Sequence, residues 1–382
     1  MQRDQPTPLL GGISPAAFMQ RYWQRKPLLI RQAFANFAPP VKAADIRKLA
    51  RRDDVESRLI WREDDAWHME NGPFARLPPA SQPEWTLLVQ GVDLHAQAMA
   101  DLMQAFRFIP DARLDDAMVS IASDGGGVGP HFDSYDVFLL QAAGKRRWRI
   151  GRQKNLSLEP DVPLKILSNF RPEEEFVLEP GDMLYLPPDV AHDGVAQGDG
   201  CMTISIGFRA PSRGEFARGM LETAADTLLD QNDERMHRLY RDRGQPAVDA
   251  PAAIPDAMIE AALKSLHKVA LDKALARRFL GMHLSEPKPG VVFDYPENLD
   301  VDLIAQWPQA GILHLDRRTR MLYCGKHVFI NGEPVARRAS ALLRKLANTR
   351  LLDCTQLRAK PEERELLQDW LEAGWLHFEQ RP

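Results

Sequence analysis

Three residues of metal-binding types are spaced so that they could share one face of a small sheet. His131 and Asp133 stand one residue apart in the glycine-rich segment Gly125–Asp136, which reads GGGVGPHFDSYD. On an extended strand alternate side chains share a face, so both can point at one metal ion. A third ligand must come from a distant strand, and His192 ends the turn–strand–turn run Pro180–His192. Two imidazoles and one carboxylate are the ligand set of non-haem Fe(II) oxygenases, which leave positions open for a chelating cosubstrate and dioxygen.

The alternative to a metal site is that these residues are ordinary structural side chains. An HxD pair is common by chance and carries little weight alone. The later histidine, placed after a Pro-Gly-Asp turn in a β-rich segment, favours the metal. We therefore expect iron at His131, Asp133 and His192, and we expect these residues to form the catalytic centre.

A basic strand that follows the metal motif could hold a second ligand. Arg146 alternates with Trp148 and Ile150, which favour burial, so its side chain should also point into the core. A buried guanidinium needs an anionic partner, and a carboxylate held in a bidentate fork is a natural match. The alternative is a structural ion pair with an aspartate or glutamate. Ser120 and Ser205, on other strands, could donate hydroxyl groups to the same ligand.

The segment that must position these side chains is rich in strands. Short apolar runs from Asp116 to Phe208 are separated by turn signals such as Gly144. Many short strands without intervening helices indicate an antiparallel sandwich or barrel. The expected strands are Met118–Ser123, Tyr135–Ala142, Arg146–Gly151, Glu175–Leu178, Met183–Leu186, Val190–Val195 and Met202–Phe208.

Helices and one short strand are expected before this segment. Ser14-Pro15 combines a capping residue with proline at the first helical position, which predicts a helix that runs to Trp23. Leu28–Ile30 reads as a buried strand, and Ala43–Arg52 and Leu94–Phe106 read as further helices.

Two regions of different character follow the strands. Residues 212–285 carry apolar residues at helical spacing, and these helices could form a dimer interface or pack internally. After a Pro/Gly-rich stretch, a hairpin is expected from Ile312–Leu315 with Met321–Cys324 and Val328–Ile330, followed by helices at Ser340–Ala347 and Glu363–Ala373. Helices beside a small sheet suggest a winged-helix-like module.

The charge, hydropathy and cysteine content of the chain argue against several classes of protein. The formal net charge is -4, and residues 283–382 carry 14 acidic and 14 basic side chains, so direct nucleic-acid binding is disfavoured. No apolar run reaches the length of a membrane span, and the N-terminus lacks a signal-peptide core. The three cysteines are widely spaced and include no CxxC pair. The expectation is a cytoplasmic protein without disulfides.

With these residues in place, the chain resembles the JmjC family of 2-oxoglutarate oxygenases. The likeness is greatest to the bacterial branch that hydroxylates an arginine of large-subunit ribosomal protein sixteen. It covers nearly the full length of the chain. It is carried by Phe18–Ile30, the glycine-rich lead into His131 and Asp133, Lys145–Trp148, Pro180–His192 and Ile206–Pro211.

The resemblance implies an α+β fold in three parts. Residues 1–211 would form the oxygenase domain, with a double-stranded β-helix (jelly-roll or cupin) core at about 116–208. Residues 212–285 would form a helical dimerisation region, and residues 286–382 a winged-helix-like C-terminal domain. A homodimer and a ribosomal protein substrate are the implied partners.

The resemblance also implies roles for individual residues. Arg146 and Ser120 would hold the distal carboxylate of 2-oxoglutarate. Many members of the family use a lysine there, and Lys145 adjoins Arg146, but strand alternation favours Arg146. Asp124 is a candidate for receiving a cationic substrate side chain, and a second candidate substrate contact is Tyr135.

The expected activity is Fe(II)- and 2-oxoglutarate-dependent hydroxylation of an arginine in a large-subunit ribosomal protein by dioxygen. Within the same class, histidine hydroxylation of a ribosomal protein or lysine demethylation stays open. A cupin isomerase or a dioxygenase without 2-oxoglutarate is disfavoured by Asp133, because that class usually supplies three histidines and a glutamate. From a different class, a non-catalytic metal-binding cupin regulator also stays open.

Overall fold

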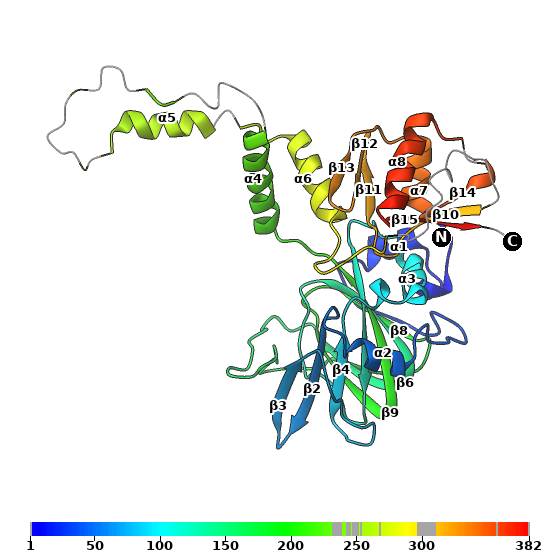
Figure 1. Cartoon of the computed structure of the whole chain (residues 1–382). Coiled ribbons are helices and arrows are strands. Elements are labelled where there is room, and N and C mark those ends of the chain that lie inside the picture. The colour runs from blue at the N-terminus through cyan, green and yellow to red at the C-terminus, as the bar shows by residue number, and fades with distance from the viewer. Residues whose placement is uncertain are drawn as a thin grey trace. The chain divides into compact units, whose positions relative to one another are not determined.

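The computed structural model describes residues 2–230, 239–241, 246, 252, 254–266, 269–295, 311–356 and 358–380. The chain forms two compact units, Met1–Ala210 and Pro211–Pro382. The elements of both are shown in Figure 1, coloured along the chain. Among the described helices, none is both long enough and apolar enough to cross a membrane.

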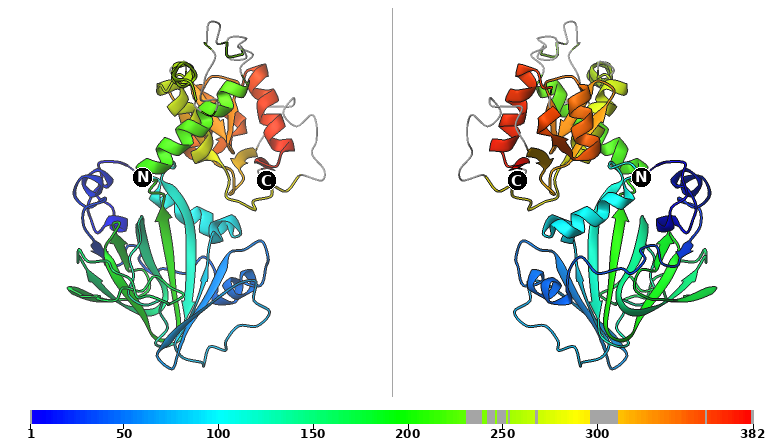
Figure 2. Two further views of the ribbon diagram at one scale, coloured as in Figure 1. Left: turned by 90° about the vertical axis from the view of Figure 1, so that its left-hand side faces the viewer. Right: turned by 90° about the vertical axis from the view of Figure 1, so that its right-hand side faces the viewer.

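The first unit is built on one antiparallel sheet of nine strands. Its order is β1-β8-β6-β9-β5-β4-β2-β3, with β7 paired to β6. The long strands β6 and β9 pair over their whole length, and the neighbouring β5 pairs with β9, as the cyan and green strands of Figure 2 show. The strands are β1 (Leu28–Ile30), β2 (Ser57–Glu63), β3 (Ala66–Asn71), β4 (Trp85–Val89), β5 (Leu114–Ala122), β6 (Asp136–Gly151), β7 (Glu174–Leu178), β8 (Met183–Leu186) and β9 (Ala191–Phe208).

The two faces of this sheet bury different clusters because side chains alternate along each strand. Phe138 of β6 belongs to the larger core, which includes residues of the helices α2 and α3. Its neighbour Leu139 belongs to a second cluster with Trp148 and Ile150, and Ile150 lies opposite His192 in the register. This second face therefore lines the predicted site. The helices of the unit are η1 (Pro8–Leu10), α1 (Pro15–Arg21), α2 (Ala43–Leu49), η2 (Val92–Leu94), α3 (Gln97–Met103) and η3 (Gln104–Phe106).

A buried carboxylate fixes the N-terminal segment to the sheet. Asp136 is fully buried and accepts hydrogen bonds from the Tyr185 hydroxyl at 2.6 Å and from Gln24 Nε2 at 3.0 Å. Arg113 lies 3.3 Å from the same carboxylate and stacks over Trp23. Burial raises the pKa of Asp136, and these hydrogen bonds partly oppose the increase. The contacts explain why the run that follows α1 is built from polar and aromatic residues.

The strands of the core are longer than the sequence predicts. Two strands, Tyr135–Ala142 and Arg146–Gly151, were expected on either side of a turn at Gly144, but β6 is continuous from Asp136 to Gly151. Gly144 has φ +60° and lies where the register between β6 and β9 shifts, so it forms a bulge rather than a turn. The predicted strands Val190–Val195 and Met202–Phe208 likewise join as β9.

The second unit contains five α-helices among its described residues. Ser340 caps α7 by accepting a hydrogen bond from the Leu343 amide at 3.2 Å, and Asp272 caps α6 in the same way. In α5 no described side chain is buried. The helices are α4 (Arg213–Asp230), α5 (Asp256–Leu266), α6 (Lys273–Ser285), α7 (Ala341–Thr349), η4 (Cys354–Gln356) and α8 (Pro361–Glu372).

The strands of this unit form two small sheets. One has the order β14-β10-β15 and the other β11-β12-β13. The prediction that Ile312–Leu315 pairs with Met321–Cys324 was wrong, because the first of these belongs to β10 and the second to β11 of the other sheet. Local spacing could not reveal that β10 pairs with strands much later in the chain. The strands are β10 (Gly311–Leu315), β11 (Met321–Cys324), β12 (His327–Ile330), β13 (Glu333–Val335), β14 (Leu351–Asp353) and β15 (Leu376–Gln380).

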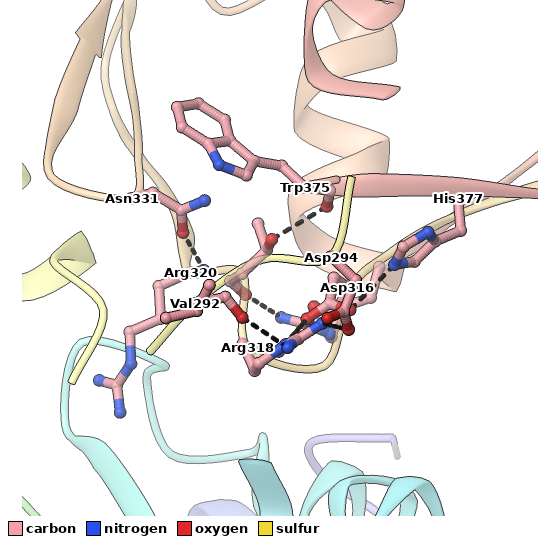
Figure 3. A network of polar contacts seen from close by, with 10 residues as sticks. Val292, Asp294, Asp316, Arg318, Arg320, Asn331, Trp375 and His377 are labelled. Carbon is pink, nitrogen blue, oxygen red and sulfur yellow. Dashed lines mark hydrogen bonds and ion pairs between the residues drawn. The ribbon is translucent and has the colours of Figure 1, made fainter. Parts of the chain in front are cut away.

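A network of polar contacts joins β10, the following turn and β15. The carboxylate of Asp316 is buried and accepts hydrogen bonds from Arg318 Nε at 2.7 Å, and its other oxygen lies 2.9 Å from His377 Nε2 (Figure 3). Arg318 also donates to the carbonyl of Val292 at 2.6 Å and to Asp294 at 2.9 Å. The guanidinium thus ties the segment before β10 to the sheet.

Candidate active site

Main-chain hydrogen bonds alone place the two histidines next to each other. His131 and His192 form an isolated antiparallel bridge in which each amide donates to the other's carbonyl, at 2.9 Å and 2.8 Å. The Asp189 amide donates to the carbonyl of Asp133 at 2.8 Å, which fixes the next residues of the same segment. Main-chain bonds therefore position all three predicted ligands.

The side chains of His131, Asp133 and His192 converge on one point. One ligand atom from each lies within 4.8 Å of the others, and His192 Nε2 is 3.7 Å from Asp133 Oδ2. The ring centroids of the histidines are 4.2 Å apart. Donor atoms at these separations can contact one ion, so the residues fit a metal centre with one carboxylate and two imidazoles.

Each histidine is oriented by a second contact. Nδ1 of His131 lies 2.9 Å from the carbonyl of Gly129, and Nδ1 of His192 lies 2.9 Å from the carbonyl of Val190. A carbonyl only accepts, so these contacts favour the proton on Nδ1 and leave the Nε2 lone pair for a metal.

The electrostatic setting of His192 also suits a metal ligand. Burial lowers the pKa of His192 to about 4, and the neighbouring His131 ring adds to the decrease. The carboxylate of Asp133 opposes it. At neutral pH the ring is therefore uncharged, which is the form that binds metals.

The glycines before His131 allow the chain to pass between neighbouring elements. A Cβ on Gly126 would lie 2.2 Å from the Trp85 carbonyl oxygen, and one on Gly127 would lie 2.8 Å from the Gly194 carbonyl oxygen. Gly129 has φ +75°, a conformation that favours glycine. The glycine-rich lead is thus a steric requirement for placing His131.

Arg146 lies inside the sheet, as strand alternation predicted. Its residue is 3% exposed, and Nη1 donates to the Gly194 carbonyl at 3.2 Å. Its other two nitrogens, Nε and Nη2, are buried and have no hydrogen-bond partner among the residues that the structure describes. No ion pair among the described residues involves Arg146, whereas exposed Lys145 pairs with Glu179 at 2.6 Å. A buried guanidinium with two unused donors fits an anionic ligand such as a dicarboxylate, so the residues present fit 2-oxoglutarate.

Ser120 and Ser205 are buried in the same sheet. Ser120 of β5 lies opposite Thr203, and Ser205 of β9 lies between Met118 and Leu139 in the register. Because Leu139 belongs to the cluster that contains Trp148, Ser205 faces the interior lined by that cluster. Their roles as cosubstrate contacts stay predictions.

The two predicted substrate contacts lie in different surroundings. Asp124 is exposed, and its carboxylate accepts a hydrogen bond from the Gly198 amide at 2.6 Å. Tyr135 is close to the metal ligands: partial burial raises its pKa, and the charges of Asp133 and Asp116 add to the increase. A Cβ placed on Gly207 would lie 3.6 Å from Asp116 Oδ1 and 4.0 Å from Tyr135 Cε2.

Asp116 was missed by the sequence reasoning. It is a buried carboxylate on β5 whose Oδ2 accepts from the Gly91 amide at 3.2 Å. A signal was present, because Asp116 stands four positions before Ser120, which is the spacing of side chains on one face of a regular strand. An acidic residue on a face that is expected to be interior is unusual enough to mark.

The fold and this site define a JmjC-domain protein of the 2-oxoglutarate oxygenase class, and comparison with known families agrees. Residues 101–216 match the family described as JmjC domain, and residues 265–377 match the family described as ROXA-like winged helix. The first match contains all three predicted metal ligands. The second contains the strands β10 to β14 and the first residues of β15, and therefore includes both small sheets of the second unit.

Relatives match over most of the chain. The Escherichia coli ribosomal protein uL16 3-hydroxylase is 32% identical over 323 residues, which are 83% of this chain and 84% of the relative. A probable ribosomal oxygenase of Haemophilus influenzae is 30% identical over 396 residues and covers 96% of each chain. The chain belongs to the ribosomal oxygenase family.

Solved structures agree over the full fold. The structure of the E. coli ribosomal oxygenase YcfD in complex with cobalt and 2-oxoglutarate superposes with a TM-score of 0.79 at 30% identity, covering 95% of this chain and 98% of that chain. An X-ray structure of E. coli YcfD gives a TM-score of 0.82 at 31% identity over the same shares. The predicted β-helix core and winged-helix-like module are confirmed by these matches.

Proposed function

We propose that the chain is an Fe(II)- and 2-oxoglutarate-dependent oxygenase that hydroxylates an arginine side chain of a large-subunit ribosomal protein. One observation carries the oxygenase part: the buried guanidinium of Arg146, with two unused donors, shares the sheet interior with the convergent His131, Asp133 and His192. The relatives named as ribosomal oxygenases support the ribosomal target.

The protein's own residues supply binding, orientation and exclusion of water. His131, Asp133 and His192 would hold the iron, and Arg146 would hold the distal carboxylate of 2-oxoglutarate with help from Ser120 and Ser205. When bound, iron and 2-oxoglutarate with dioxygen supply the oxidising power to replace a C–H bond by C–OH, with succinate and carbon dioxide as coproducts. The apolar cluster around Trp148 and Ile150 keeps the interior dry, which strengthens each polar contact in the site.

An arginine substrate needs a carboxylate near the metal, and the structure offers one. Asp116 and Tyr135 lie side by side near Gly207, and the negative charge of Asp133 also acts on Tyr135. A guanidinium between Asp116 and Tyr135 would find a charge partner and an aromatic face. Asp124, which is exposed, stays a candidate for this role. We favour Asp116, because it is buried and its charge, like that of Asp133, acts on Tyr135.

The decisive experiment measures succinate formed from 2-oxoglutarate and Fe(II), with and without ribosomal proteins, together with intact masses of those proteins. Succinate stimulated by one protein that gains a single oxygen would support the proposal, and fragmentation would locate the oxygen. Oxygen on a histidine would establish the histidine hydroxylase instead, and loss of a methyl group would establish a demethylase. Bound iron without succinate under any condition would favour a metal-binding cupin regulator or an isomerase.

We also propose that the three sequence regions have separate tasks. Residues 1–211 would carry catalysis, residues 212–285 would form a homodimer interface, and residues 286–382 would form the winged-helix-like domain. The dimer is supported by the apolar side chains of α5: Ile259 is 47% exposed, Leu263 48% and Leu266 59%. An amphipathic helix with no buried described residue needs a partner for this apolar face.

A further inference from the structure

The second unit separates its charges along the sequence, although their sum is zero. Residues 317–350 contain nine lysines and arginines and one glutamate, whereas residues 351–382 contain four basic and seven acidic residues. The overall balance therefore hides a strongly basic segment. This segment includes the β11–β12–β13 sheet and α7.

Four of these cations are exposed and lie on adjoining pieces of the chain. Lys326 stands in the turn between β11 and β12, Arg337 and Arg338 follow β13, and Lys345 lies on α7; each is exposed. We name these four residues the basic face. None of them takes part in an ion pair among the described residues.

Hydrogen bonds hold the pieces of the basic face together. The Ala339 amide donates to the carbonyl of Lys326 at 2.9 Å. Arg344, next to Lys345, donates from Nε to the Ala339 carbonyl at 3.1 Å and from Nη2 to the Gly325 carbonyl. The turn, the loop after β13 and the start of α7 are thus one surface, and Figure 1 shows β11, β12 and α7 as neighbours.

The acidic residue of the segment does not neutralise this surface. Glu333 pairs with Ile330 at the far end of the β12–β13 hairpin, while Lys326 and Arg337 adjoin its other end. The helix α6, which packs on this sheet, contains no acidic residue, and Glu286 just after it lies near Gly332 at the end that holds Glu333. The positive charges therefore face solvent without an ion-pair partner in the part of the chain that the structure describes.

From this arrangement we propose that the basic face binds the phosphate backbone of nucleic acid. Several exposed cations on a hairpin and a helix can neutralise successive phosphates of a nucleic acid. Two of the four are arginines, whose planar guanidinium groups suit phosphate oxygens. Arg344 also lies over the Tyr323 ring at 5.0 Å, which leaves an aromatic side chain at the edge of the face. The proposal is independent of the oxygenase chemistry. It differs from the expectation drawn from the neutral total charge, because it rests on where the charges lie along the chain.

The test measures binding of the full chain to a fluorescent RNA hairpin and to duplex DNA of equal length over a range of salt concentrations. Wild-type protein should bind RNA, DNA or both saturably at low salt. The variant Lys326→Glu/Arg337→Glu/Arg338→Glu should bind at least about tenfold more weakly, and its slope of log affinity against log salt should fall by about 2–3. Preference between the two probes then tells which nucleic acid is the source of the phosphates.

A matched variant distinguishes binding at the basic face from a general effect of the net charge of the protein. Arg25→Glu/Arg51→Glu/Lys154→Glu makes the same change in net charge at exposed positions of the first unit. It should leave affinity within about twofold, because none of the three residues belongs to the basic face, and charges that do not contact the phosphates contribute little once salt screens them. Unchanged thermal unfolding of both variants checks the fold. The proposal is overturned if wild type does not bind or if both variants weaken binding equally. It is also overturned if polyglutamate displaces the labelled nucleic acid from the protein as effectively as unlabelled nucleic acid does.

Discussion

At the scale of single residues, the proposed cosubstrate pocket depends on two nitrogens of Arg146 that have no partner among the described residues. Nε and Nη2 are buried, so leaving them unpaired is unfavourable until an anion binds. Lys145, one residue earlier, points to the opposite face and already has a partner in Glu179. Because the two neighbouring cations have such different surroundings, a variant of Lys145 can serve as the control for a variant of Arg146.

Replacing Arg146 with alanine should raise the KM for 2-oxoglutarate by about 10- to 100-fold, since charge-assisted hydrogen bonds contribute about 1.5–3 kcal/mol. Lys145→Ala should change that KM by less than about twofold, because exposed ion pairs contribute little. Succinate formation at varied 2-oxoglutarate concentration measures both. The reverse ranking would show that the carboxylate is held from the other face of β6.

The metal ligands give a second prediction at this scale. His131→Ala should abolish turnover and weaken Fe(II) or Co(II) binding at least about tenfold in calorimetry, because it removes one of three protein ligands. The metal-free variant should unfold close to wild type, since His131 is only half-buried. His95→Ala, which removes a histidine away from the centre, is the control. Wild-type turnover without the His131 ring would refute the ligand assignment.

The sequence predicts these residues well where chemistry is carried by residue type and strand alternation. The HxD spacing placed His131 and Asp133 together, and the alternation with Trp148 put Arg146 inside. Asp116 was not predicted, because the role proposed for it depends on its nearness to Tyr135, which comes from a segment beyond the glycine-rich loop. Contacts between distant segments depend on the register in which the strands pair. That register cannot be read from a single sequence.

At the scale of elements, the glycine-rich lead determines where the metal motif lies. Gly126→Ala should destabilise the protein by about 1–3 kcal/mol, because its Cβ would overlap the backbone at Trp85. The displaced loop should also weaken metal binding. Gly214→Ala, at the start of α4, has its nearest neighbour at 3.7 Å and should change stability by less than about 0.5 kcal/mol.

Urea denaturation and metal titration of both glycine variants test this idea. Equal stability of Gly126→Ala and wild type would mean that the loop can move away from Trp85 without loss, and that the glycine is not sterically required.

Element boundaries were less predictable than element types. The apolar runs of β6 and β9 are visible in the sequence, but Gly144 predicts a turn as readily as a bulge, because glycine with positive φ serves both. The pairing of β10 with β14 and β15 was missed for a related reason. Hairpins are visible locally, whereas strands that pair across two helices are not.

The Asp316 network gives a prediction with a defined pH dependence. Burial alone would raise the pKa of Asp316, but hydrogen bonds from His377 and Arg318 outweigh burial and place the pKa well below its usual range. The unfolded chain therefore takes up a proton first as the pH falls. The stabilisation should be complete above about pH 5 and should be lost progressively as the pH falls below about 4.

Asp316→Asn should consequently lower the free energy of unfolding by about 2–3 kcal/mol at neutral pH, since Arg318 loses its buried counter-charge. The difference from wild type should shrink as the pH falls towards 3. Urea denaturation followed at several pH values measures it. Glu333→Gln, an exposed residue of the same unit, should show no such trend. A pH-independent difference for Asp316→Asn would mean that its effect is steric.

At the scale of the whole molecule, the dimer that we propose depends on the exposed apolar side of α5. Ile259 and Leu263 lie one turn apart, and both are nearly half exposed. Ile259→Glu/Leu263→Glu should convert a dimer into a monomer, because two carboxylates placed at an apolar interface would be desolvated without partners. Light scattering after size exclusion at several protein concentrations measures the mass directly.

A control on the same helix keeps that result specific. Glu260→Lys/Lys264→Glu alters two exposed charged residues of α5 without changing its apolar side, so the mass should stay that of wild type. Iron-dependent succinate formation reports separately on the site in the first unit, which the α5 changes leave untouched. A wild-type protein that is monomeric at every concentration would remove the dimer from the proposal, and the apolar side of α5 would then need an occupant other than a second copy of the chain.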